Sequence, residues 1–217
     1  MPGLEDILRR DTLEIRDFYI EFLRLNDSQA QQIKKYWPKI SINQNPEYHA
    51  ALAFSDQNKY IFEFTPEAVG DTLAKAEEVG HYFSLILNPH AKKALFKAEK
   101  GSMEHIAAVA QQEYIARMLA LEYLKYKGIQ GSNNLWSKLD NNKIILLTEK
   151  PSDILSHYAG YLAAEQDLNN EAGTKNLIKA LYSNDAKRFA RISEKLGPRI
   201  HVLPPNSNYD APYAIAA

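Results

Sequence analysis

Apolar residues recur at helical spacing through the first part of the chain. They form one stripe with a period of 3.6 residues at Leu4, Ile7, Leu8, Ile15, Phe18, Tyr19 and Phe22. The segment Asn26-Asp27-Ser28 interrupts this stripe, and a shorter helix is predicted through QAQQIKKYW, ending before Pro38. Because SINQNPEYH is rich in turn formers, we expect helices followed by a turn within residues 1–45.

The pattern then becomes strand-like between residues 49 and 64. HAALAF and KYIFEF are short β-like runs joined by the polar segment SDQN, and Tyr60, Phe62 and Phe64 alternate with their neighbours in the second run. This alternation predicts a β-hairpin with one buried aromatic face. KIILLT at residues 143–148 is a further strand candidate, which we expect either in the same small sheet or apart from it.

Most of the remaining chain has helical patterns bounded by start and stop signals. Thr65-Pro66-Glu67 is typical of a helix start, and the helix is expected to run to Asn88-Pro89. A long helix is predicted between Ser102 and Gly128, and a third group of helices between Pro151 and Gly197-Pro198. The tail, residues 198–217, has turn and extended character.

These elements predict an α+β fold that is mainly α-helical. We expect one domain over residues 1–200, made of N-terminal helices (1–45), a hairpin with helices (46–127) and a C-terminal strand with helices (143–197). An extended or mobile tail, 198–217, follows this domain.

Composition narrows the class of protein. Lys and Arg number 26 against 27 Asp and Glu, and no basic run exceeds two residues, so nucleic-acid binding is not expected. There is no cysteine, which excludes disulfides, thiolate ligands and cysteine nucleophiles. The N-terminus lacks the apolar core of a signal peptide, and the apolar runs are too short for a membrane helix. We therefore expect a soluble, cytoplasmic protein, and the oligomeric state stays open.

One segment, DTLAKAEEVGHYF at residues 71–83, carries candidate chemistry. In the zinc-peptidase pattern H-E-x-x-H, the two histidines lie one helical turn apart on one face and bind one cation, and the glutamate accepts a proton from water. Glu78 and His81 occupy the positions of the base and of the second histidine. Glu77 stands where the first histidine would be.

This segment resembles the helix of small gluzincin metallopeptidases, in particular the phage-repressor-regulating peptidases, which often read tlaHElgHyl and have a hairpin or edge strand just upstream. Their third ligand is a glutamate in an E-x-x-A pattern on a later helix, which corresponds to Glu113 with Ala116 in QEYIARMLALEYL. The resemblance spans roughly residues 50–125. It implies a metal site of Glu77, His81 and Glu113, with Glu78 as the catalytic base for peptide-bond hydrolysis.

The replacement of the first histidine by Glu77 leaves several interpretations open. A Glu/His/Glu site would lower the Lewis acidity of zinc and suit Mn²⁺ somewhat better, while the same replacement is typical of a pseudoenzyme without metal. Alternatively, Glu77 and His81 form a surface pair, Glu78 is a solvated acid, and Glu113 pairs with Arg117 one turn on. Gly80, at a cost of about 1 kcal/mol in a helix, predicts close packing against another element. His157 is expected to be either a core histidine or an alternative ligand in a central cleft.

Three hypotheses of function follow. The first is a divergent or degenerate zincin-like metallopeptidase that acts on a peptide or protein. The second is a non-catalytic helical protein that binds another protein, such as an effector, an immunity factor or a mobile-element accessory protein; a regulatory module that keeps the zincin fold without metal is a third. Phosphate-binding loops and the G-x-S-x-G elbow are missing from the sequence.

Overall fold

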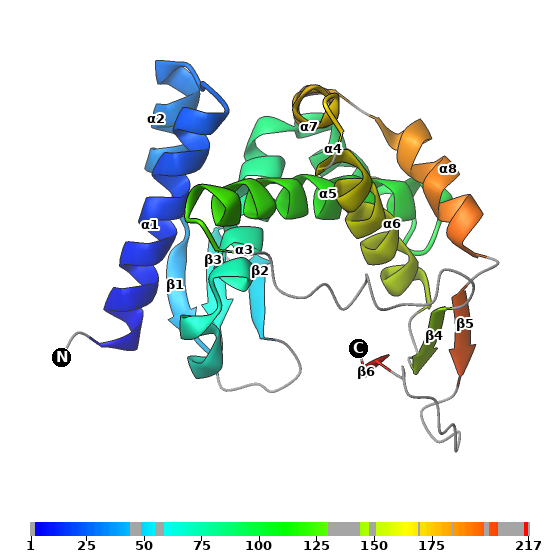
Figure 1. The fold of residues 1–217 in the computed structure, drawn as a ribbon, viewed down its shortest axis with the longest axis horizontal. Coiled ribbons are helices and arrows are strands. Elements are labelled where there is room, and N and C mark those ends of the chain that lie inside the picture. The colour runs from blue at the N-terminus through cyan, green and yellow to red at the C-terminus, as the bar shows by residue number, and fades with distance from the viewer. Residues whose placement is uncertain are drawn as a thin grey trace.

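One long helix, α5 (Met103–Tyr126), runs through the centre of the molecule (Figure 1). The computed structural model describes residues 3–43, 49–54, 59–129, 144–147, 151–168, 170–183, 185–197, 200–203 and 215–216. Side chains of α5 are buried on nearly all sides from Ile106 to Leu124. Most of these buried residues are apolar, but Gln111, Gln112, Glu113 and Arg117 are buried as well. The long helix predicted from Ser102 to Gly128 is confirmed.

Other helices surround α5. Those that precede it in the chain are α1 (Leu4–Phe22), α2 (Asp27–Lys35), α3 (Thr72–Leu87) and α4 (Pro89–Lys97). Those that follow it are α6 (Pro151–Leu168), α7 (Gly173–Tyr182) and α8 (Ala186–Leu196). Buried residues of α6, α7 and α8 belong to the same hydrophobic core as those of α1, α3 and α5. The mainly helical α+β fold predicted from the sequence is confirmed.

The predicted hairpin is present as β2 (Ala50–Phe54) and β3 (Tyr60–Phe64), which pair antiparallel. Phe62 and Phe64 are fully buried, which confirms the aromatic face. A third strand, β1 (Lys39–Ile42), pairs parallel to β3 and gives the order β1-β3-β2. The expectation of a turn here was therefore incomplete: Ser41 and Ile42 extend along β3 because a strand needs only a neighbour with free backbone groups.

The strand predicted at residues 143–148 does not join this sheet. It forms β4 (Ile144–Leu147), which pairs parallel with β5 (Ile200–Leu203) and with β6 (Ile215–Ala216) in a second sheet. The tail thus contributes the two partner strands of β4, as Figure 1 shows at its lower right.

The helix that carries the candidate site begins later than predicted. Pro66–Gly70 form a short 3-10 helix, η1, and α3 starts at Thr72. The Asp71 carboxylate accepts from the backbone N–H of Ala74 at 2.9 Å and so caps the start of α3. The Thr65 side chain makes no such capping hydrogen bond. Thr65 and Pro66 do begin a helical turn, but it is the 3-10 helix η1 and not the start of α3, because Pro66 suits either kind of first turn.

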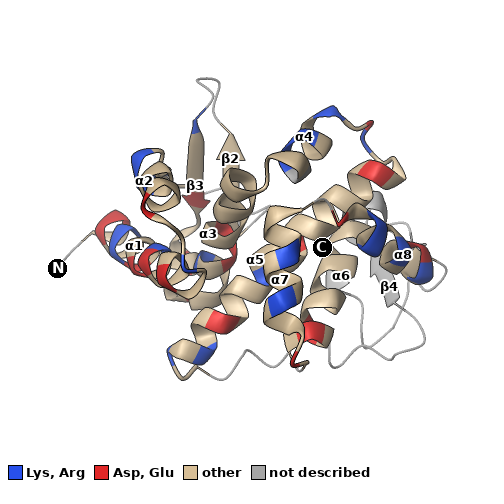
Figure 2. Ribbon diagram, turned by 90° about the horizontal axis from the view of Figure 1, so that it is seen from above, with Lys and Arg blue, Asp and Glu red and all other residues tan. Residues whose placement is uncertain are grey.

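Buried polar contacts hold α1 against α3. The Lys75 ammonium, 4% exposed, donates to the Asp11 carboxylate at 2.7 Å, and the Tyr19 hydroxyl donates to the Ala76 carbonyl at 2.9 Å. Acidic and basic residues are interspersed along the rest of α1 (Figure 2). None of the described helices combines the length and the apolar character needed to cross a membrane.

Candidate functional site

A cleft of about 340 Å³ opens between β2, α3, α5 and α6. Six side chains with polar groups from the three helices line it: Glu77, Glu78, His81, Glu113, His157 and Tyr161. The three residues predicted as metal ligands and the predicted base therefore all reach one cleft. The cleft also contains two residues of α6, which lies outside the segment that resembles a known family.

The close approach of α3 to α5 depends on Gly80. A Cβ at this position would lie 2.7 Å from the Cα of Ala116 and 3.0 Å from its carbonyl oxygen. These are backbone atoms of α5, so only a residue without a side chain fits without a shift of one helix. The close packing predicted from Gly80 is confirmed, and it places the next residue, His81, beside Glu113.

A second glycine brings α6 equally close to the other side of α5. A Cβ on Gly160 would lie 2.5 Å from the Cβ of Glu113 and 2.6 Å from the Ala110 carbonyl oxygen. His157 lies three residues before Gly160, and residues at this spacing share a helix face. The two glycines thus position a histidine on each side of Glu113.

Glu113 is a buried carboxylate, 8% exposed, between two imidazoles. Its Oε2 lies 3.6 Å from His81 Nε2, and its Oε1 lies 3.2 Å from His157 Nε2. The His81 side chain is 18% exposed, whereas that of His157 is 48% exposed. His157 therefore stands at the rim of the cleft and His81 lies deeper.

Glu77 is in the cleft, but its carboxylate has a cationic partner. Arg117 Nη1 donates to Glu77 Oε1 at 2.7 Å, and the Arg117 guanidinium lies 4.9 Å from the centre of the Tyr161 ring. Burial raises the pKa of Glu77, and the charge of Arg117 opposes that rise. Arg117, expected as a partner of Glu113 within its own helix, bonds across to α3 instead.

Glu78 lies in the inner part of the cleft. Burial raises its pKa to about 7, the nearby carboxylates of Glu113 and Glu77 add to the rise, and His81 opposes it. The backbone N–H of Leu52 in β2 donates to this carboxylate. A carboxyl group with a pKa near neutrality is suited to accept and release a proton in catalysis.

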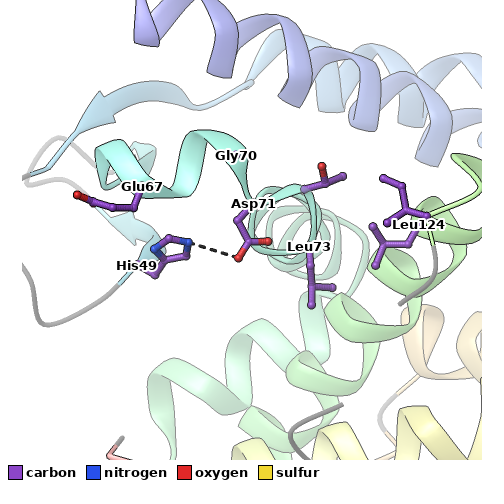
Figure 3. Close-up of a pocket in the computed structure, with 8 residues that line it drawn as sticks. His49, Glu67, Gly70, Asp71, Leu73 and Leu124 are labelled. Atoms are coloured by element: carbon purple, nitrogen blue, oxygen red, sulfur yellow. Dashed lines mark ion pairs between the residues drawn. The ribbon is translucent and has the colours of Figure 1, made fainter. Parts of the chain in front are cut away.

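A second cavity of about 470 Å³ adjoins the cleft at the start of α3 (Figure 3). His49, Asp71 and Leu73 line both spaces. His49 Nε2 lies 3.3 Å from Asp71 Oδ2, the ion pair drawn in Figure 3. Sequence reasoning missed this pair because the two residues are separated by the whole hairpin, and no spacing rule connects them.

The described part of the chain contains no group of three or more His, Asp or Glu side chains that is arranged to hold a metal ion as the side chains stand. The two imidazoles contact different oxygens of Glu113, and Glu77 is bound to Arg117. The metal-ligand roles of Glu77, His81 and Glu113 stay predictions. The contribution of Tyr161 was missed, although His157 and Tyr161 are spaced i, i+4 in the sequence.

Comparisons of the chain with protein families, with curated proteins and with solved structures found no match.

Proposed function

We propose that the cleft is the active site of a metal-dependent hydrolase that cleaves peptide bonds. The observation that carries this proposal is the convergence of Glu78 and His81 from α3 with Glu113 from α5 around one cleft. His81 Nε2 and Glu113 Oε2 are 3.6 Å apart although the residues are 32 positions apart in the sequence (113 − 81). Helix spacing alone does not bring them together; the close packing at Gly80 does.

The donor types match a divalent metal. Imidazole nitrogen and carboxylate oxygen are ligands that zinc accepts. A divalent cation held by His81 and Glu113 would supply Lewis-acid activation of a water molecule and of the scissile carbonyl group. The Glu77 carboxylate, which the family resemblance offered as a further ligand, is neutralised by Arg117 and is not used in this proposal.

Glu78 is the general base. Its carboxylate accepts a proton as the oxygen of water forms a bond to the carbonyl carbon, and it returns that proton to the leaving nitrogen as the C–N bond breaks. Burial raises the pKa of Glu78 to about 7 in the metal-free chain, and a cation in the cleft would shift it toward the basic form. The N–H of Leu52 holds the carboxylate toward β2.

The substrate class follows from β2, an edge strand of the sheet among the described residues. The N–H of Thr65 donates to the His49 carbonyl, so His49 and every second residue after it face β3. Ala50 and Phe54 then present their backbone groups to this edge, where the Leu52 N–H is already taken by Glu78, and Ala50 lines the cleft. An extended peptide can add to such an edge as a further strand.

Metal analysis combined with a peptidase assay tests this function. Protein purified without chelator is expected to contain about one metal ion per chain and to cleave unfolded protein substrates, with new termini detected by mass spectrometry. Glu78→Gln should keep the metal and lose about 10²–10⁴-fold in rate, the usual contribution of a general base. Glu104→Gln, a change at an exposed acid in the first turn of α5, is the matched control and should be fully active.

A chain that takes up no added Zn²⁺ or Mn²⁺ and cleaves nothing would overturn the proposal. That outcome would favour the second candidate, a non-catalytic protein-binding module. One observation supports that candidate: the exposed side chains of Phe54 and Phe96 lie together, with ring centres 6.1 Å apart, at the C-terminal end of β2. Exposed aromatic side chains are enriched in binding surfaces.

A further inference from the structure

Two exposed aromatic side chains lie side by side where β2 ends. Phe54, the last residue of β2, is 47% exposed, and Phe96 of α4 is 57% exposed. Their ring centres are 6.1 Å apart, and the Phe54 ring also packs edge-on against Tyr60 of β3, at 5.1 Å. Aromatic side chains contribute strongly to binding when a partner covers them. The Phe54–Phe96 pair therefore offers an apolar surface directly beside a strand edge.

The register of the sheet defines which side chain of an added strand would cover this pair. His49 and every second residue after it bond to β3, so Phe54 turns its backbone N–H and carbonyl to the outer edge, where the described residues place no further strand. A residue that pairs with Phe54 through both groups has its side chain on the same face of the sheet as the Phe54 ring. That is the face on which Phe54 meets Phe96. The side chain of the added residue would lie against both rings.

Lysines surround the Phe54–Phe96 pair on the side of α4. This helix, PHAKKALFK, has three lysines and no acidic residue, and its basic positions are coloured blue in Figure 2. The Lys92 ammonium lies 5.3 Å from the centre of the Tyr60 ring, which packs against Phe54. Lys97 follows Phe96 directly and is exposed. A cationic rim attracts negative charge, so a peptide with an acidic residue near its bulky apolar residue complements this surface.

The same strand edge leads from the aromatic pair to the cleft. The N–H of Leu52, two residues before Phe54, donates to the Glu78 carboxylate, and Ala50 lines the cleft. Two residues of a strand span about 7 Å. Antiparallel pairs are slightly more stable per residue than parallel ones. A peptide paired antiparallel to β2, with one side chain on the Phe54–Phe96 pair, therefore passes Glu78 about two residues further toward its C-terminus.

We infer that the Phe54–Phe96 pair is the subsite for a bulky apolar side chain of an extended peptide that pairs with β2 and carries an acidic residue on the N-terminal side of that side chain. This inference deepens the proposed function and rests on its pairing of a peptide with β2; binding at the subsite does not need hydrolysis. A phenylalanine side chain reaches both rings, whereas an alanine side chain is too short to cover them. The acidic residue lies toward the lysines of α4 and away from Glu78.

Fluorescence anisotropy with the labelled peptide Thr-Glu-Thr-X-Thr-Thr-Thr tests the subsite, on the full chain with chelator present so that no peptide is cut. With X as phenylalanine the peptide should bind about tenfold or more tightly than with X as alanine, because a large ring becomes covered. Phe96→Ala should bind both peptides about equally. Tyr36→Ala, a change at a 55% exposed aromatic residue after α2, is the matched control and should keep the tenfold difference.

Two changes to the peptide test its charge and its pairing. Lysine in place of the glutamate should weaken binding several-fold at low salt, and this difference should shrink at high salt because ions screen it. N-methylation of the phenylalanine removes the N–H that would donate to the Phe54 carbonyl. The methylated peptide should therefore bind no more tightly than the alanine peptide. Equal binding of the methylated and unmethylated peptides would overturn the pairing with β2.

Two further measurements separate the outcomes. Thermal unfolding should be nearly the same for Phe96→Ala and the unchanged chain, because Phe96 is mostly exposed, which shows that a loss of preference is not a loss of the fold. With Zn²⁺ added in place of chelator, the phenylalanine peptide should be cut within about three residues on the C-terminal side of X. Binding without cleavage would overturn the proposed function and leave the subsite. If the unchanged chain or Phe96→Ala shows the same affinity and cleavage rate for the two peptides as the other protein does, the subsite is overturned and the proposed function stands on its own assay.

Discussion

The ion pair between Glu77 and Arg117 offers a direct test of how the cleft is built. The two side chains come from α3 and α5, their N–O distance is 2.7 Å, and they are 15% and 5% exposed. Replacing Arg117 with Met removes the charge and keeps most of the side-chain length. Replacing Glu77 with Met does the same on the other helix. The double variant leaves two apolar side chains in contact.

The expected magnitude comes from burial of the pair. Removing one partner of a buried ion pair leaves the other charge uncompensated and typically costs 3–5 kcal/mol of unfolding free energy. Arg117→Met should cost about 4 kcal/mol, including about 0.5–1 kcal/mol for the lost contact with the Tyr161 ring. Glu77→Met should cost about 3 kcal/mol, since the ring contact remains. The double variant should be much closer to the unchanged chain than the sum of about 7 kcal/mol, because an apolar pair is often as stable as a buried ion pair.

Urea unfolding of the four proteins at pH 7, with chelator present, measures the coupling free energy. A cost below about 1 kcal/mol for Arg117→Met would refute the reasoning, because it would place the pair among exposed ion pairs. Zinc titration of the double variant then decides the role of Glu77. If Glu77 serves only Arg117, the double variant binds zinc as tightly as the unchanged chain. If it loses zinc, Glu77 is a ligand, as the family resemblance implied.

Two further predictions concern α3. Gly80→Ala should destabilise the fold by about 1–2 kcal/mol, since a clash with the Ala116 backbone costs more than the roughly 1 kcal/mol gained in helix propensity. Gly197→Ala is the control, because open space surrounds Gly197, and it should not destabilise the fold. Urea unfolding of the two variants compares them. The Glu78 carboxyl has a pKa of 4.5 in the unfolded chain and about 7 in the folded chain. The folded state therefore binds more protons in this window, and the free energy of unfolding falls by about 3 kcal/mol as the pH rises from 4.5 to 7. Glu78→Gln should abolish this part of the fall in chelated protein, and unchanged pH dependence would contradict the pKa.

The elements that the sequence predicted well have clear end signals or a strong local period. The run between the cap Ser102 and Gly128 became α5, and the alternation of Tyr60, Phe62 and Phe64 became the aromatic face of β3. Strand β1 was missed because its pairing depends on β3, about 20 residues later, and four residues carry too little periodicity. The start of α3 was misplaced because Thr65-Pro66 begins η1 with the same signals that begin an α-helix.

The site was predictable only to the level of a helix face. Spacing predicted that Glu77 and His81 lie one turn apart on one face of α3, with Glu78 beside that face, and all three side chains reach the cleft. Spacing could not say which partner each side chain finds, because that depends on how α3 is positioned along α5. The register is set by the contact of Gly80 with α5, and it places Arg117 beside Glu77. The position of His157 depends likewise on α6 packing against α5 at Gly160.

Arg117 gives the Glu77 carboxylate a cationic partner inside the cleft. A ligand set of Glu77, His81 and Glu113 beside Glu78 would put three carboxylates around one cation and weaken it as a Lewis acid. The buried guanidinium of Arg117 removes one of these charges from the set, at a distance of 2.7 Å. A cation held by His81 and Glu113 would then have one carboxylate ligand with Glu78 beside it, which would leave it a stronger Lewis acid than an arrangement of three carboxylates.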